Sequence, residues 1–163
     1  MTAFADALTA LGHERFADSR DLLVAIVAEH PTWADAWALL SSAHLALAEV
    51  DRATAASERA VALAPDAFLP RMKAGELALR LGLTETAEAE FLGAVRATGT
   101  DTADAVAARR ALAIARRANR AGLAHRALLP NVGAILGPAV RPIRAGGSFV
   151  ARIRRSRAVR EAI

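Results

Sequence analysis

The chain has 163 residues and a net charge of +4, and 54% of its residues are hydrophobic, which fits one compact domain with an appendage. It has no cysteine, which excludes disulfides and thiolate chemistry and fits a reducing compartment. Lys73 is the only lysine, whereas arginine and alanine are frequent. We interpret this composition as that of a protein from a GC-rich bacterial genome.

Small residues recur along the first hundred positions at a period of 34. Ala7, Ser41 and Gly75 share one offset, and three further sets follow the same spacing: Ser19, Ala53 and Ala87; Ile26, Ala60 and Ala94; Val27, Val61 and Val95. A 34-residue period with small residues at fixed offsets is typical of stacked helical hairpins. At these positions a larger side chain would separate two crossing helices, at a cost of ~1–3 kcal/mol.

The apolar spacing within each unit predicts a first helix and a second helix. Asp51 and Thr84 are the predicted N-caps of two second helices, and Pro31 and Pro65 stand just past the ends of two of them, where proline stops a helix. The predicted second helices cover residues 16–29, 51–64 and 84–97.

From residue 100 the pattern changes. A fourth helix is predicted to begin after Thr100 or Thr102 and to run to about Ala124. One of its faces is apolar and another is basic, which is the expected form of a terminal capping helix. The basic face would carry Arg109, Arg110, Arg116, Arg117 and Arg120. We interpret it as a solvated surface first and a partner-binding surface second.

The charge divides the chain into two parts. Residues 1–100 have a balance of −6, and residues 101–163 a balance of +10, which suggests that the two parts meet different partners or each other. The basic tail is expected to contact an anionic partner through Arg152, Arg154, Arg155, Arg157 and Arg160. A membrane surface, an acidic protein and the chain's own acidic part all remain open; nucleic acid is less favoured because no recognition motif accompanies the arginines.

No membrane-spanning segment is expected. The longest uncharged apolar run, residues 127–140, contains Pro130 and Pro138 and is shorter than the ~18–20 residues that cross a bilayer. Asp6 interrupts the apolar N-terminus, so no signal peptide is predicted. The expected location is the cytoplasm, with peripheral membrane contact as the alternative.

The period and its fixed residues resemble those of tetratricopeptide repeat (TPR) proteins. The second unit carries the fullest match: Trp37, Leu40, Ser41, His44, Ala48, Val50, Ala53, Ala60 and Pro65. The resemblance implies an all-α, right-handed superhelix of three hairpins, over residues 1–33, 34–67 and 68–101. A capping helix over 102–125 and a tail over 126–163 complete the predicted division. Arg71 departs from the pattern because it occupies the aromatic position that Trp37 fills.

The resemblance also implies a groove lined by the first helices. In this sequence it would present Phe4, Leu8, Leu11, Ala38, Ser42, Leu45, Leu69, Met72, Lys73, Glu76, Leu79 and Arg80. Only Lys73 and Arg80 are basic, so capture of a chaperone's C-terminal carboxylate is not expected. An apolar peptide or amphipathic helix suits this set, unless the chain's own fourth helix and tail cover it.

Two functions follow from these features. The first is a non-enzymatic adaptor or assembly chaperone that holds a client in the groove while the tail docks on the same complex. The second is a membrane or nucleic-acid tether through the basic tail. No catalytic residue, metal site or cofactor is predicted: His13, His30, His44 and His125 lack ligand spacing, and His44 is expected to be a packed ring. The sequence leaves the client and any self-association open.

Overall fold

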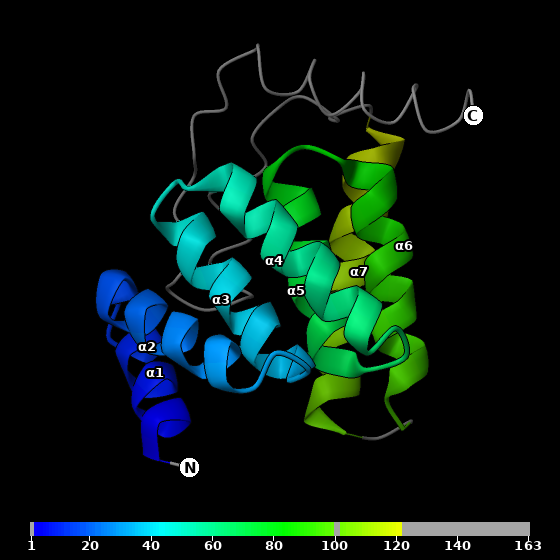
Figure 1. Cartoon of the computed structure of the whole chain (residues 1–163). Helices are drawn as coiled ribbons and strands as arrows, with labels where there is room; N and C mark the ends of the chain where they lie inside the picture. The colour runs from blue at the N-terminus through cyan, green and yellow to red at the C-terminus, as the bar shows by residue number, and fades with distance from the viewer. Residues whose placement is uncertain (1, 100–101, 122–163) are drawn as a thin grey trace, which may run out of the picture.

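The structure, a computed structural model, describes residues 2–99 and 102–121 (Figure 1). Over these residues the chain forms seven α-helices and no strand, so the all-α expectation is confirmed. The helices are α1 (Thr2–Gly12), α2 (Phe16–Glu29), α3 (Ala34–Ala46), α4 (Val50–Leu63), α5 (Phe68–Arg80), α6 (Thr84–Ala97) and α7 (Ala103–Arg120).

The helices pack in chain order, from the blue α1 to the yellow α7 in Figure 1. The pairs α1–α2, α3–α4 and α5–α6 are hairpins, and α2 packs on α3, α4 on α5, and α3 on α5. Each hairpin therefore buries an apolar face against its neighbour, as stacked repeats do. This helical, repeat-like bundle is compatible with a TPR-like fold.

The turn inside each hairpin has the same geometry at a spacing of 34 residues. Glu14, Ala48 and Gly82 have φ angles of 58°, 62° and 73°, in the left-handed region that favours glycine. In each turn the next residue's N–H donates to a carbonyl five positions back, at 2.8, 2.9 and 2.8 Å. These bonds, which satisfy the last carbonyls of α1, α3 and α5, are Arg15 to Ala10, Glu49 to His44 and Leu83 to Ala78.

The turn between hairpins also repeats, and it accounts for Arg71. The indole Nε1 of Trp37 donates to the carbonyl oxygen of Pro31 at 3.0 Å. The Nε of Arg71, 34 residues later, donates to the carbonyl oxygen of Pro65 at 2.6 Å. Arginine therefore replaces the aromatic ring because it supplies the same N–H donor, six residues after the same acceptor.

The small residues lie at close helix crossings. Ser41 Oγ donates to the Ala53 carbonyl at 2.8 Å, so α3 and α4 approach closely enough for a serine hydroxyl to span them. In the third hairpin, Gly75 lies against the ring of Phe91, which is fully buried. The bulky ring of α6 fits because α5 has no side chain at that point.

Two predicted N-caps are wrong. Helix α4 begins at Val50 and α6 at Thr84, which places Asp51 and Thr84 in the first turn, and neither start has a side-chain cap bond. The reason is the turn geometry, since each second helix starts two residues after a left-handed residue. The fourth helix does begin after Thr102, whose Oγ1 accepts from the Ala105 N–H at 3.1 Å.

Helix α7 covers the outer side of α6. Its buried side is almost entirely alanine with Leu112, and its five arginines are exposed, as the sequence predicts for a capping helix. Arg116 Nε pairs with Glu88 Oε1 at 3.0 Å, and Asn119 donates to Glu88 Oε2 at 3.3 Å. These two bonds tie α7 to α6. Predictions for residues 122–163 lie outside the described residues.

Candidate functional site: the α3–α5 face

Nine of the predicted groove residues lie on α3 and α5, two helices that pack against each other. Consecutive members on each helix are one, three or four residues apart, which places them on one side of that helix. We refer to this set as the α3–α5 face: Ala38, Ser42, Leu45, Leu69, Met72, Lys73, Glu76, Leu79 and Arg80.

Two of the three predicted groove residues of α1, Phe4 and Leu11, pack against the same core cluster as Leu69 of this face. Phe4 stacks on Trp33, with the ring centroids 4.4 Å apart, and Leu11 packs against the cluster around Leu23 and Leu40. Only Leu8 is left 45% exposed. Two of these three side chains are therefore partly buried against the core, and a binding role for them stays a prediction.

Most apolar side chains of the α3–α5 face also contribute to the core. Leu45 belongs to a buried cluster with Leu77 and Leu81, and Met72 and Leu79 belong to a cluster that includes Phe91. Ala38 is fully buried. Ser42, Leu69 and Lys73 are half-buried, so these three have the greatest free surface for contact with another molecule.

The charged residues of the face form one cluster along α5. Lys73 Nζ lies 3.0 and 3.2 Å from the two carboxylate oxygens of Glu76, and Glu76 is 6% exposed. Arg80, one turn further, is 4% exposed. Burial lowers the pKa of Arg80 to about 10, and the charge of Glu76 opposes that shift.

The guanidinium of Arg80 is incompletely satisfied. Within residues 2–99 and 102–121, its Nε has no hydrogen-bond partner. A buried donor without an acceptor costs roughly 1–3 kcal/mol. Arg80 therefore carries a buried N–H on α5 without an acceptor among these residues.

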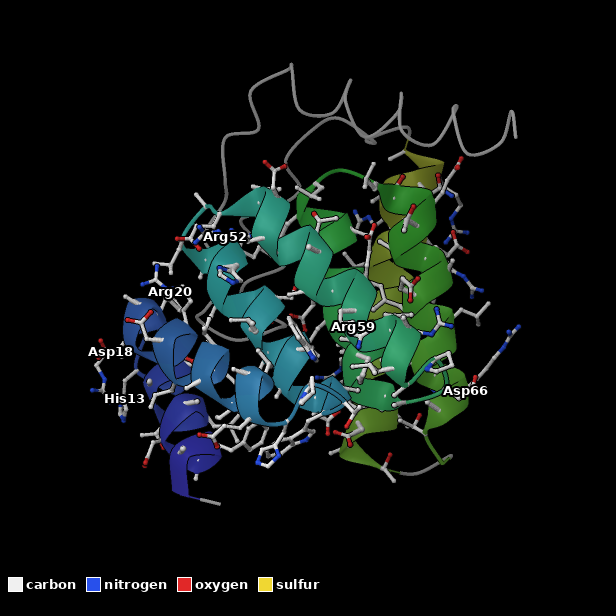
Figure 2. All side chains as sticks on the ribbon, viewed as in Figure 1. His13, Asp18, Arg20, Arg52, Arg59 and Asp66 are labelled. Carbon is white, nitrogen blue, oxygen red and sulfur yellow. The ribbon has the colours of Figure 1, made fainter. Side chains whose placement is uncertain are left out.

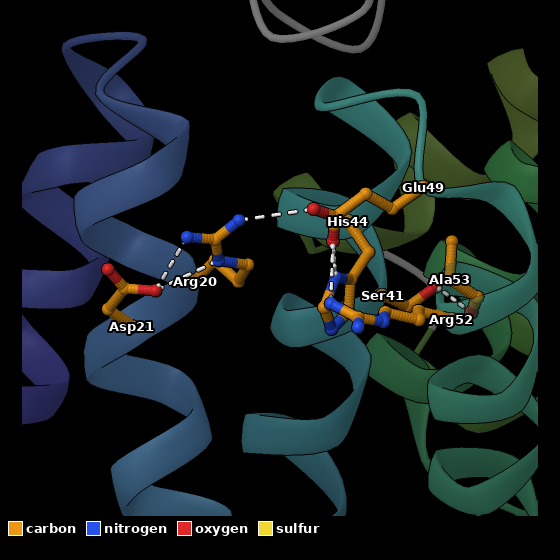
Figure 3. Close-up of polar contacts among 7 residues, drawn as sticks. All are labelled: Arg20, Asp21, Ser41, His44, Glu49, Arg52 and Ala53. Carbon is orange, nitrogen blue, oxygen red and sulfur yellow. Dashed lines mark hydrogen bonds and ion pairs between the residues drawn. The ribbon is translucent and has the colours of Figure 1, made fainter.

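Sequence reasoning missed a polar network that joins the first two hairpins (Figure 3). His44 Nδ1 lies 2.5 Å from Glu49 Oε2, and Arg20 Nη1 lies 3.1 Å from Glu49 Oε1. The His44 hydrogen bond, with the Arg20 charge, holds the pKa of Glu49 below its ordinary value. His44 is 6% exposed, so it is a packed ring as predicted, but one with a carboxylate partner.

A metal site and a membrane span each place requirements on the described residues. Over the described part of the chain, no cluster of three or more histidine or acidic side chains is placed to hold a metal ion. In the same residues no helix is long and apolar enough to cross a membrane. The predicted contacts Arg152, Arg154, Arg155, Arg157 and Arg160 lie outside the described residues.

Comparison with known proteins adds no relative. No family profile matches the chain, and no curated protein matches it. The resemblance to TPR proteins therefore rests on the 34-residue spacing of its own residues, together with the turns and inter-hairpin bonds that recur at the same spacing.

Proposed function

We propose that this protein is a TPR-like adaptor or assembly chaperone that binds an apolar peptide or helix of a client on its α3–α5 face. The observation that carries the proposal is the composition of that face. Its half-buried residues are Ser42, Leu69 and Lys73, and Lys73 belongs to the charged cluster with Glu76 and Arg80 on α5. Such a surface suits an amphipathic segment that also carries a hydrogen-bond acceptor.

Ser42 is the best position to test binding on this face. It is half-buried, and its hydroxyl makes only a long bond of 3.4 Å to the Ala38 carbonyl within its own helix. Leu45 and Met72 are less suitable because both belong to core clusters, so a charged substitution there would unfold the protein rather than report binding. Arg59 provides the control, since it is exposed on α4 (Figure 2).

The experiment places a photo-reactive phenylalanine at position 42 or at position 59 of the full chain in cells. A client of the α3–α5 face is expected to cross-link from position 42 and not from position 59. The purified client should then bind the unmodified chain, and Ser42→Glu should weaken its Kd at least tenfold while Arg59→Glu leaves it unchanged. Equal cross-linking from both positions, or equal affinities of both variants, would refute the proposal.

A second candidate function is supported by the arginines of α7. All five are exposed. They belong to residues 101–163, whose net charge is +10. We propose as the alternative a tether to an anionic membrane surface or nucleic acid. Charge-driven binding weakens with salt. Co-sedimentation with phosphatidylserine vesicles should therefore fall steeply between about 50 mM and about 300 mM salt. Binding that salt leaves unchanged would count against the tether.

A further inference from the structure

We infer that the α3–α5 face is occupied by residues 127–140 of the same chain when no client is bound. The face would then be an intramolecular docking surface, and a client would bind by displacing this segment. The inference concerns the resting protein, so it can be tested without any client and independently of the proposed function.

The first observation is the state of α5. Glu76 and Arg80 are 6% and 4% exposed, although charged side chains are almost never fully buried unless they are paired. Glu76 is paired with Lys73, but Arg80 Nε has no partner among the described residues. Such a buried donor indicates an acceptor from outside residues 2–99 and 102–121.

The second observation is where the described chain ends. Asn119 Oδ1, near the end of α7, lies 3.5 Å from the Thr84 hydroxyl, and Thr84 follows Arg80 by only four residues. The chain therefore leaves Ala121 at the Arg80 end of α5. The 13 residues of α5 span ~20 Å, whereas 14 extended residues reach ~46 Å. Residues 127–140 are long enough to follow the whole face.

The third observation is the chemistry of the segment. Residues 127–140 carry no charge. Their leucine, isoleucine and valine side chains could bury apolar area against the half-buried Leu69. Pro130, Pro138, Gly133 and Gly137 oppose a continuous helix. A backbone carbonyl that such a break in a helix leaves without a helical partner would be an acceptor for Arg80 Nε.

The charge balance also favours an intramolecular contact. Residues 1–100 carry −6 and residues 101–163 carry +10, so the C-terminal part is attracted to the hairpins. Arg126 and Arg141 stand at the two ends of the uncharged segment and would keep their charges at its margins. A free apolar run of this length would otherwise be an aggregation liability.

The absence of cysteine from the chain allows a direct test. Two cysteines are introduced into the full chain, Ser42→Cys on α3 with Ile135→Cys in the segment, and a short bismaleimide linker is added at low protein concentration. The matched control combines Arg59→Cys on α4 with Ile135→Cys. Val132→Cys and Leu136→Cys replace Ile135→Cys in parallel to cover the register. Cross-linked monomer is measured on denaturing gels against time.

A docked segment holds its cysteine near position 42, whereas a free one samples both positions with similar effective concentrations. We expect the Ser42 pair to cross-link at least tenfold faster than the Arg59 pair for one or more of the three registers. Equal rates throughout would overturn the inference. Cross-linked dimer in place of monomer would also overturn it, in favour of a segment from a second copy.

Arg80→Met tests the role of the guanidinium within the same assay. The variant removes the buried donor and keeps a side chain of similar length, and circular dichroism confirms that it folds. We expect the Ser42 pair to lose most of its rate advantage in this background. An undiminished rate in the folded variant would refute the assignment of Arg80 as the residue that holds the segment.

Discussion

The contact between Gly75 and Phe91 gives the sharpest test of why small residues recur at 34-residue intervals. A Cβ at position 75 would lie 2.5 Å from Phe91 Cε1 and 2.6 Å from Cδ1. Atoms at those distances overlap, so either the ring or α5 must move. Phe91 is fully buried within a cluster shared by α5, α6 and α7, which leaves the ring little room.

The expected cost of Gly75→Ala is a difference between two effects. Overpacking of a core costs ~1–3 kcal/mol, while replacing a mid-helix glycine by alanine gains ~1 kcal/mol of helix propensity. Because the overlap falls on a confined ring, we place the overpacking cost at the upper end. The net loss of unfolding free energy is then about 1–2 kcal/mol.

Urea denaturation followed by circular dichroism measures this loss. With a slope of ~2 kcal/mol per molar urea, the midpoint should fall by roughly 0.5–1 M. Gly12→Ala is the control at the end of α1, because its Cβ would meet no atom within 4 Å. That variant should keep or raise the midpoint.

A double variant, Gly75→Ala with Phe91→Leu, identifies the clash as the cause. The smaller side chain makes room for the new Cβ, so the double variant should lose less free energy than the two single variants added together. The reasoning fails if Gly75→Ala behaves like Gly12→Ala, or if the losses are additive.

Three further predictions concern other local features. Ala48→Gly should raise the free energy of unfolding by about 0.5–1 kcal/mol, because alanine at a φ of 62° is strained by ~1–2 kcal/mol. Glycine removes this strain, but it also increases the conformational entropy of the unfolded chain, which offsets part of the gain. A lower urea midpoint would show that the turn is not strained. Thr102→Ala should cost ~1 kcal/mol and speed hydrogen exchange at Ala105 at the start of α7, whereas unchanged exchange would mean that the cap bond contributes nothing. Glu49 has a folded pKa below its ordinary value of 4.5, so the stability it adds is present above pH 4.5 and is lost as the pH falls through the folded pKa. Glu49→Gln should therefore lower the urea midpoint at pH 7 and approach the parent protein's midpoint near pH 3, and a pH-independent difference would assign the effect to packing against His44 rather than to charge.

The sequence predicted the second helix of each hairpin to within one residue. Two predicted second helices, over residues 16–29 and 84–97, match α2 and α6, and the third is displaced by one residue in α4. Apolar spacing identifies a helix because one face must be buried. The start of α4 was misplaced because Ala48 takes a left-handed conformation, and nothing in an alanine indicates it.

The site was harder to predict than the fold. Leu79 fits the spacing of a groove residue, yet it packs in the core cluster with Phe91, because the same side of a repeat helix can serve either use. The Arg20–Glu49 pair joins residues 29 positions apart, a distance over which no local pattern acts. The burial of Arg80 was also missed, since an arginine is expected at the surface unless its surroundings are known.

The bonds from Trp37 and Arg71 to the two proline carbonyls bear on how such a repeat tolerates substitution. An indole and a guanidinium share neither shape, charge nor hydrophobicity, but both are planar and both place an N–H at the end of a long side chain. The feature that the two positions share is therefore a side-chain N–H that can reach a carbonyl oxygen across an inter-hairpin turn. Successive hairpins can exchange one chemical type for another without disturbing the stacking, so the outer surface of each unit is free to acquire a charge of its own.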